Sequence, residues 1–111
     1  MKKKVDAEHP NELWAKRFKE ARLAAGLSQR QLGLDVGLDD FVASTRINRY
    51  ELGVHRADYP MEVKLAKALS VPVAYFYAEA DDLAKLLIAF HRAPKAARKL
   101  AMAALAGDVA G

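Results

Sequence analysis

Hydrophobic residues recur every three or four positions along most of the chain, the spacing that places them on one face of an α-helix. In the first such segment, residues 11–25, the apolar positions are Trp14, Phe18, Ala21 and Ala25. The other faces carry Lys16, Arg17, Lys19 and Glu20. Asn11 is of a type that caps helix N-termini, and Gly26 can end the helix. No segment alternates apolar and polar residues as a half-buried strand would, so the pattern predicts an all-α fold.

A second, shorter helix follows directly. The hydroxyl of Ser28 can accept a hydrogen bond from the first free amides of a helix that runs to about Val36. Leu32 and Val36 form its buried pair, and Gly37 can stop it. A helix of this length, followed by a glycine-containing turn, is typical of the first half of a helix-turn-helix.

The third helix is defined best at its end. Ile47, Tyr50 and Glu51 share one side at i, i+3 and i+4, and Gly53 closes the helix. Its start has two candidates: a helix from about Phe41 capped by Asp39 or Asp40, or a helix from about Ser44. We favour the earlier start.

Two prolines mark the next helices. Pro60 suits the first residue of a fourth helix, and Pro72 opens a short fifth helix. The expected inner stripe of the fourth helix is Val63, Ala66 and Leu69. Tyr75 and Phe76 of the fifth helix are expected to complete the core of a five-helix domain.

Residues 80–111 read as a helical extension. Asp81 and Asp82 favour a new helix start, and Pro94 separates this helix from an Ala-rich one ending at Gly107. The apolar stripe of the first of these two helices is Leu83, Leu86, Leu87 and Phe90. This stripe exceeds the needs of a five-helix domain, so it either packs back on the core or meets its copy in a dimer.

Composition narrows the range of functions. The 111 residues suit one domain, or one small domain with an appendage, and the net charge of +4 with a pI near 9.4 favours an anionic partner. The absence of cysteine excludes disulfides and thiolate metal sites. The basic start, Lys2 to Lys4, lacks the apolar run of a signal peptide, and no apolar stretch is long enough to span a bilayer. We therefore expect a cytoplasmic protein without membrane association.

Catalytic patterns are missing from the sequence. His9, His55 and His91 lie in separate segments, and there is no glycine-rich phosphate loop or nucleophile elbow. The adjacent pairs Asp39–Asp40 and Asp81–Asp82 are explained more simply by negative charge at helix starts. The sequence predicts no enzyme activity, no metal and no cofactor.

Four segments in order resemble the Cro and phage-repressor-like helix-turn-helix family, also called the XRE family. They are Arg22, LSQRQLG at 27–33, RINRYELG at 46–53 and KLAKALSVPVAYFY at 64–77. The resemblance covers residues 14–77 and implies a five-helix lambda-repressor-like DNA-binding domain whose third helix enters the major groove of double-stranded DNA. It also implies that Gln29 contacts DNA and that Arg22 pairs with Glu51.

Two residue-level arguments accompany this resemblance. Glu51 shares the inward side with Ile47 and Tyr50, so a partly desolvated carboxylate there needs a partner such as Arg22. The chain departs from the family pattern by about four extra residues between Gly37 and the alignable part of the third helix. Four residues are close to one helical turn, so we expect them to lengthen that helix at its front.

The outer side of the third helix supplies the candidate base contacts. Stepping 100° per residue from Ile47 places Thr45 and Arg49 opposite the core, with Val42 beside them if the helix starts early. The candidate base-reading residues are Ser44, Thr45, Arg46, Asn48 and Arg49. Arginine pairs with a guanine edge, asparagine with adenine, and threonine or valine touches a thymine methyl group. The simpler interpretation is a solvated polar face.

Phosphate contacts are expected from a helix start and from a loop. These candidates are Gln29, Arg30, His55 and Arg56. Residues 1–10, with Lys2, Lys3 and Lys4, are expected to form a flexible basic arm that either follows the DNA backbone or stays solvated. The reading domain then spans residues 11–79.

The leading hypothesis is a sequence-specific transcriptional regulator, a repressor, that acts as a homodimer and reads the major groove with the helix ending at Leu52. The alternative is an antitoxin-like or adaptor protein whose C-terminal helices bind a protein partner. The two differ in which substitution disrupts function: Arg49 for the regulator, Leu86 or Phe90 for the partner-binding protein.

Overall fold

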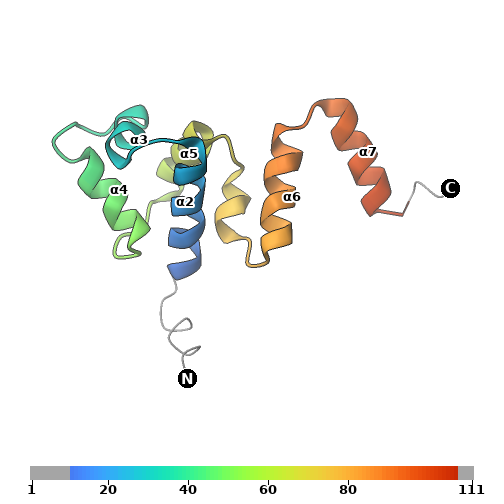
Figure 1. Cartoon of the computed structure of the whole chain (residues 1–111), viewed down its shortest axis with the longest axis horizontal. Helices are drawn as coiled ribbons and strands as arrows, with labels where there is room; N and C mark the ends of the chain where they lie inside the picture. The colour runs from blue at the N-terminus through green and yellow to red at the C-terminus, as the bar shows by residue number, and fades with distance from the viewer. Residues whose placement is uncertain (1–10, 108–111) are drawn as a thin grey trace, which may run out of the picture.

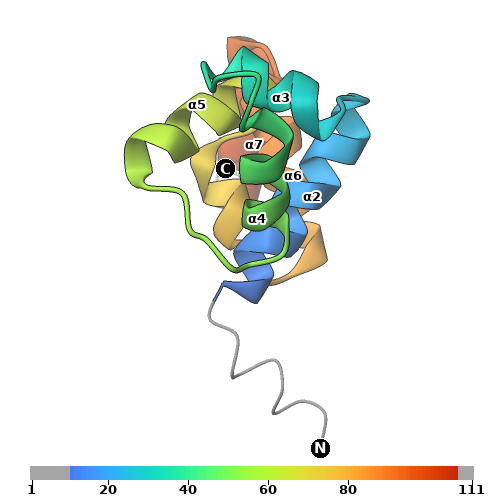
Figure 2. The same cartoon turned by 90° about the vertical axis from the view of Figure 1, so that its left-hand side faces the viewer.

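The computed structural model describes residues 11–107, and all regular structure in that range is helical (Figures 1 and 2). The elements are α2 (Glu12–Ala25), α3 (Gln29–Asp35), α4 (Ala43–Glu51), α5 (Tyr59–Leu69), the 3₁₀ helix η1 (Val73–Tyr77), α6 (Asp81–Arg92) and α7 (Lys95–Leu105). The prediction of an all-α fold is confirmed. None of these helices is long and apolar enough to cross a bilayer.

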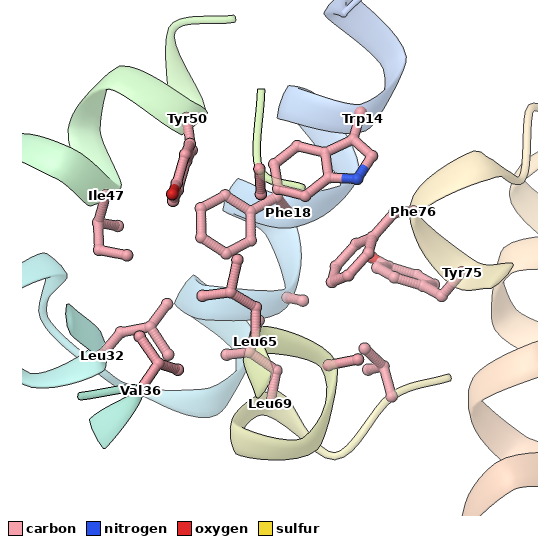
Figure 3. Close-up of a cluster of buried hydrophobic side chains, with 14 of the residues drawn as sticks. Trp14, Phe18, Leu32, Val36, Ile47, Tyr50, Leu65, Leu69, Tyr75 and Phe76 are labelled. Carbon is pink, nitrogen blue, oxygen red and sulfur yellow. The ribbon is translucent and has the colours of Figure 1, made fainter. Parts of the chain in front are cut away.

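The core lies between α2, α3, α4, α5 and η1 and is built around aromatic rings (Figure 3). The Trp14 ring lies 5.0 Å from the rings of both Phe18 and Phe76, and Tyr50 meets Phe18 edge to face at 6.2 Å between centroids. Aromatic pairs in these geometries add to the stabilisation from burial alone. Tyr75 and Phe76 are both buried, so the expected contribution of the fifth helix is confirmed.

Two of the predicted helix ends are confirmed and one cap is wrong. Gly26 adopts a left-handed conformation with φ of 73° after α2, and the Ser28 hydroxyl accepts the Gln31 amide at 2.9 Å. The side chain of Asn11 makes no cap hydrogen bond. Its Nδ2 instead donates to the carbonyl of Gly53 at 3.3 Å, which joins the start of α2 to the end of α4.

The favoured early start of α4 is wrong, because the helix begins at Ala43. The extra residues form a loop instead of an added helical turn, with the Val42 amide donating to the Asp39 carbonyl at 2.9 Å. Asp40, one of the two candidate caps, pairs with Arg30 on α3 instead of capping a helix at Phe41. A Cβ on Gly33 would lie 2.6 Å from the Cβ of Ala43, so the two backbones are in close contact at that point. This contact packs Ala43, the first residue of α4, closely against α3.

The inner face of α5 differs from the predicted stripe. Val63 is 40% exposed, and the buried residues are Glu62, Leu65, Ala66 and Leu69. The helix begins one residue before Pro60, where the Asp58 side chain accepts the Met61 amide at 2.9 Å. Sequence periodicity did not predict that Glu62 would lie on the inner face. Its carboxylate accepts a hydrogen bond there from the Tyr77 hydroxyl.

The face of α2 also departs from the expected pattern at two positions. Ala25 is exposed, whereas Arg17, expected on the polar side, is buried. The Arg17 guanidinium donates to the carbonyls of Ala78 at 2.8 Å and Glu79 at 3.0 Å, and to the Asp81 carboxylate at 3.1 Å. Arg17 therefore fastens α2 to the segment that leads into α6.

The C-terminal helices are packed loosely by comparison. α6 contacts the core through Ala84, Leu87 and Ile88, while Leu83 and Leu86 of the predicted stripe stay exposed. Figure 1 shows α7 displaced from the rest of the molecule, and none of its residues is buried. Of the two alternatives for this stripe, packing on the core applies to Leu87, whereas Leu83 and Leu86 are exposed and Phe90 is partly buried. A dimer contact through the exposed residues stays a prediction.

Candidate nucleic-acid interface

α3 and α4 form the candidate interface and lie on the same side of the molecule (Figure 2). Ala43, Ile47 and Tyr50 turn α4 towards the core and are buried. The opposite side of α4 exposes Ser44, Thr45, Asn48 and Arg49, and Arg46 is partly buried between the two sides. The predicted division of this helix into an inner and an outer side is confirmed. Val42 is exposed but precedes the helix.

Arg22 joins three elements behind this surface. Its Nε and one terminal nitrogen donate to the two carboxylate oxygens of Glu51, and its other terminal nitrogen donates to the Leu27 carbonyl at 2.8 Å. The side chains of Arg22 and Glu51 are only 10% and 3% exposed. Two parallel hydrogen bonds give the pair a defined geometry. The ion pair implied by the family resemblance is confirmed, and it fixes the end of α4 against α2.

Gln29 connects the start of α3 to the outer side of α4. Its Nε2 donates to Asn48 Oδ1 at 3.1 Å and to Glu51 Oε1 at 3.0 Å. These bonds hold the side chains of Gln29 and Asn48 beside each other at the surface. Sequence reasoning did not find this contact, because the two residues lie 19 positions apart and neither periodicity nor capping links them.

Arg30 forms an ion pair with the loop before α4. Its Nε and a terminal nitrogen donate to the two Asp40 oxygens at 2.7 and 3.1 Å. The hydrogen bond from Arg30 lowers the pKa of the Asp40 carboxyl below its ordinary value. Both side chains are exposed, so the pair contributes little to folding. Asp40, one of the two predicted caps of an early-starting α4, bridges to α3 instead.

The loop after α4 carries the last two predicted contacts. His55 is exposed, and its backbone amide donates to the Arg49 carbonyl at 3.4 Å. Arg56 donates to the side chains of Asn11 at 3.3 Å and Tyr77 at 2.8 Å. Its guanidinium also lies 5.6 Å from the centroid of the Tyr77 ring. Arg56 is therefore held against the N-terminal end of α2.

The remaining predictions concern a basic arm and the absence of a metal. Lys2, Lys3 and Lys4, with the rest of residues 1–10, lie outside the described residues. Within residues 11–107, no group of three or more His, Cys, Asp or Glu side chains is arranged to hold a metal ion. The candidate interface consists of hydrogen-bonding and basic side chains on α3, α4 and the two adjoining loops.

Comparison with known proteins agrees with this geometry. A family model described as helix-turn-helix matches residues 18–76, more than half of the chain. The chain belongs to the Cro/phage-repressor-like helix-turn-helix family. Its members are DNA-binding regulators rather than enzymes.

A solved structure extends the similarity into the C-terminal helices. The crystal structure of the transcriptional regulator BswR is 38% identical and superposes with a TM-score of 0.79. The match covers 84% of this helix-turn-helix protein and 92% of the BswR chain. The covered 84% of the 111 residues is longer than residues 1–79 together. The similarity to BswR therefore continues beyond the reading domain. No curated protein matches the sequence.

Proposed function

We propose that this protein is a sequence-specific transcriptional regulator that represses its targets by binding double-stranded DNA with α4 in the major groove. The observation that carries the proposal is the exposed polar side of α4, held in place by Arg22, Glu51 and Gln29. Base readout requires side chains whose positions are fixed before binding. The likeness to BswR, named as a transcriptional regulator, supports the same function.

The contacts divide by chemistry. The base-reading residues are Ser44, Thr45, Arg46, Asn48 and Arg49. Arg49 pairs with a guanine edge through two hydrogen bonds, and Asn48, oriented by Gln29, reads adenine. The phosphate-binding residues are Gln29, Arg30, His55 and Arg56. They flank α4 at the start of α3 and in the loop after α4, where phosphate contacts set the register of a reading helix.

The functional form is a homodimer of a cytoplasmic protein, joined through the C-terminal helices. α6 and α7 expose Leu83, Leu86, Leu100, Met102 and Leu105. A second copy presents the same apolar surface, so the two can cover each other with twofold symmetry. A twofold dimer would place two α4 helices on half-sites one helical turn of DNA apart, as helix-turn-helix dimers require. Repression would follow from occupying the promoter.

Selection of bound sequences from a random duplex library at near-physiological salt tests the proposal. The parent protein should recover a palindromic site, and Arg49→Ala should lose it or relax one position in each half-site. Lys19→Ala, which removes the same charge from an exposed position on α2, should select the parent's site. Sequence-blind, strongly salt-dependent binding by the parent would contradict sequence-specific reading.

A second candidate function rests on the same exposed side chains of α6 and α7. An antitoxin-like or adaptor protein would use them to bind a different protein. Leu86→Asp separates the candidates when oligomeric state and DNA binding are measured together. A parent dimer that Leu86→Asp converts to a monomer with weaker palindrome binding supports the regulator. A parent that is already monomeric, and whose half-sites show no fixed spacing, favours the partner-binding protein.

A further inference from the structure

No residue of the loop between α3 and α4 is among the DNA contacts proposed above. The loop comprises Leu38 to Val42 and forms the outer edge of the molecule beside the first turn of α4 (Figure 1). Both ends are fixed. Leu38 packs against the core, and its amide donates to the Gly33 carbonyl at 2.9 Å. At the other end Ala43 is fully buried against Gly33. The loop therefore has a defined position relative to α4.

The middle of this loop presents a large apolar side chain to solvent. Phe41 is 92% exposed, more than any other large hydrophobic residue in the described part of the chain. It lies two residues before α4, so its backbone is within about 7 Å of the helix start. Exposed aromatic residues next to a binding surface commonly gain their apolar contacts in the complex.

The Arg30–Asp40 ion pair joins this loop to α3. Asp40 immediately precedes Phe41, and its carboxylate accepts both hydrogen bonds from Arg30 on the first turn of α3. This pairing also neutralises a carboxylate that would otherwise face the phosphates of a bound duplex. The loop thus presents its apolar residue to solvent beside the start of α4, with the charge of Asp40 offset by Arg30.

We propose that the loop at 38–42 is a second reading element, in which Phe41 contacts thymine methyl groups at base pairs flanking those read by α4. Asp40 acts as a positioning residue through Arg30. The inference rests on the proposed DNA-reading function and deepens it. The major groove displays the thymine methyl group as its main apolar feature, and phenylalanine is among the side chains that contact it. The four extra residues thereby widen the site instead of lengthening α4.

The experiment measures affinity for the duplex that the parent selects, made with thymidine or with deoxyuridine at the flanking positions. Deoxyuridine removes only the methyl group. The parent should bind the deoxyuridine duplex about two- to fivefold more weakly. Phe41→Ala should bind the thymidine duplex about three- to tenfold more weakly than the parent and should not distinguish the two duplexes. Leu23→Ala, which truncates an exposed leucine on α2, should behave like the parent.

Asp40→Asn tests the positioning role. It should reduce the discrimination between thymidine and deoxyuridine, while binding to unrelated duplexes becomes tighter and more salt-dependent because Arg30 is released. If the parent selects no site, the proposed function fails and this inference fails with it. If Arg49→Ala loses the site but Phe41→Ala retains both its affinity and its thymidine preference, only the reading role of the loop is overturned. Equal weakening on both duplexes, with the parent blind to the methyl group, also overturns it.

Discussion

The reading domain and the C-terminal helices use similar residues in opposite ways. In residues 11–79, one set of large apolar side chains forms a closed core, and Phe18, Leu32, Ile47, Leu65 and Phe76 are fully buried. In α6 and α7, only Ala84 is buried. The first arrangement stabilises a folded domain, whereas the second leaves apolar surface that water contacts unfavourably until something covers it.

The polar contacts differ between the regions as well. The reading domain buries Arg17, Arg22 and Glu62, each satisfied by residues from another element. α7 is connected to α6 mainly at a corner, where Arg98 donates to the carbonyls of Phe90 at 2.9 Å and His91 at 2.7 Å. The buried Arg22–Glu51 pair, with its two parallel hydrogen bonds, holds the end of α4 against α2.

The largest expected effect comes from Arg22→Ala in the reading domain. It leaves Glu51 buried without its partner, so the free energy of unfolding should fall by about 3–5 kcal/mol. Urea denaturation followed by circular dichroism measures the change. Arg30→Ala, which removes an exposed ion pair, is the matched control and should leave the free energy of unfolding nearly unchanged. A loss below about 1 kcal/mol for Arg22→Ala would show that the Arg22–Glu51 pair is not buried as described.

Truncation of apolar side chains contrasts the two regions directly. Leu65→Ala opens a cavity in a fully buried site and should lower the free energy of unfolding by about 2–5 kcal/mol. Leu100→Ala on α7 removes the same atoms from a side chain that is 72% exposed. It should change the free energy of unfolding of the monomer by about 0.5 kcal/mol or less. Thermal melts at low protein concentration compare the two. Equal losses would mean that α7 is covered in the monomer.

Removing α7 separates its contribution to stability from its contribution to association. A chain ending at Ala93 loses no buried residue from the described range 94–107, so the free energy of unfolding of its monomer should stay within about 1 kcal/mol of the parent's. Its tendency to associate should fall, as sedimentation at a series of concentrations would reveal. Unchanged association would place the dimer contact elsewhere. A collapse in stability would instead give α7 a structural role within one chain.

The most local effect is expected at the corner between α6 and α7. Arg98→Ala removes two hydrogen bonds to carbonyls at the end of α6 and the contact of its guanidinium with the Phe90 ring, 5.5 Å away. Because the site is partly exposed, the loss should be about 1 kcal/mol. Hydrogen exchange should show faster amide exchange in the last turn of α6, with the amides of α2 unaffected. Faster exchange throughout the reading domain would contradict a local role.

Local signals explain why most of the fold was predictable. Glycine at 26, serine at 28 and proline at 60 each act within a few residues, and each lies at or beside a helix end in the structure. The inner side of α4 follows from helical periodicity around Ile47. The Arg22–Glu51 pair could be predicted, although its members lie 29 residues apart, because the family resemblance names both partners.

The failures have a common physical cause. Arg17 finds its acceptors 61 and 62 residues away, and buried Glu62 finds its donor in η1, so neither contact leaves a local trace in the sequence. The start of α4 was misjudged because two interactions compete for Asp40, and the ion pair with Arg30 prevails over a helix cap. Such contacts depend on tertiary packing, which periodicity does not report.

The contact between Gly33 and Ala43 also limits how this protein can evolve. A Cβ at position 33 would approach not only the Ala43 Cβ at 2.6 Å but also its Cα and carbonyl oxygen, both at 2.9 Å. A smaller residue at position 43 would leave the two backbone clashes in place, so no second-site change there restores the fit. Relief requires the loop itself to change length or path. Insertions in that loop and the identity of residue 33 are therefore expected to vary together among descendants of this sequence.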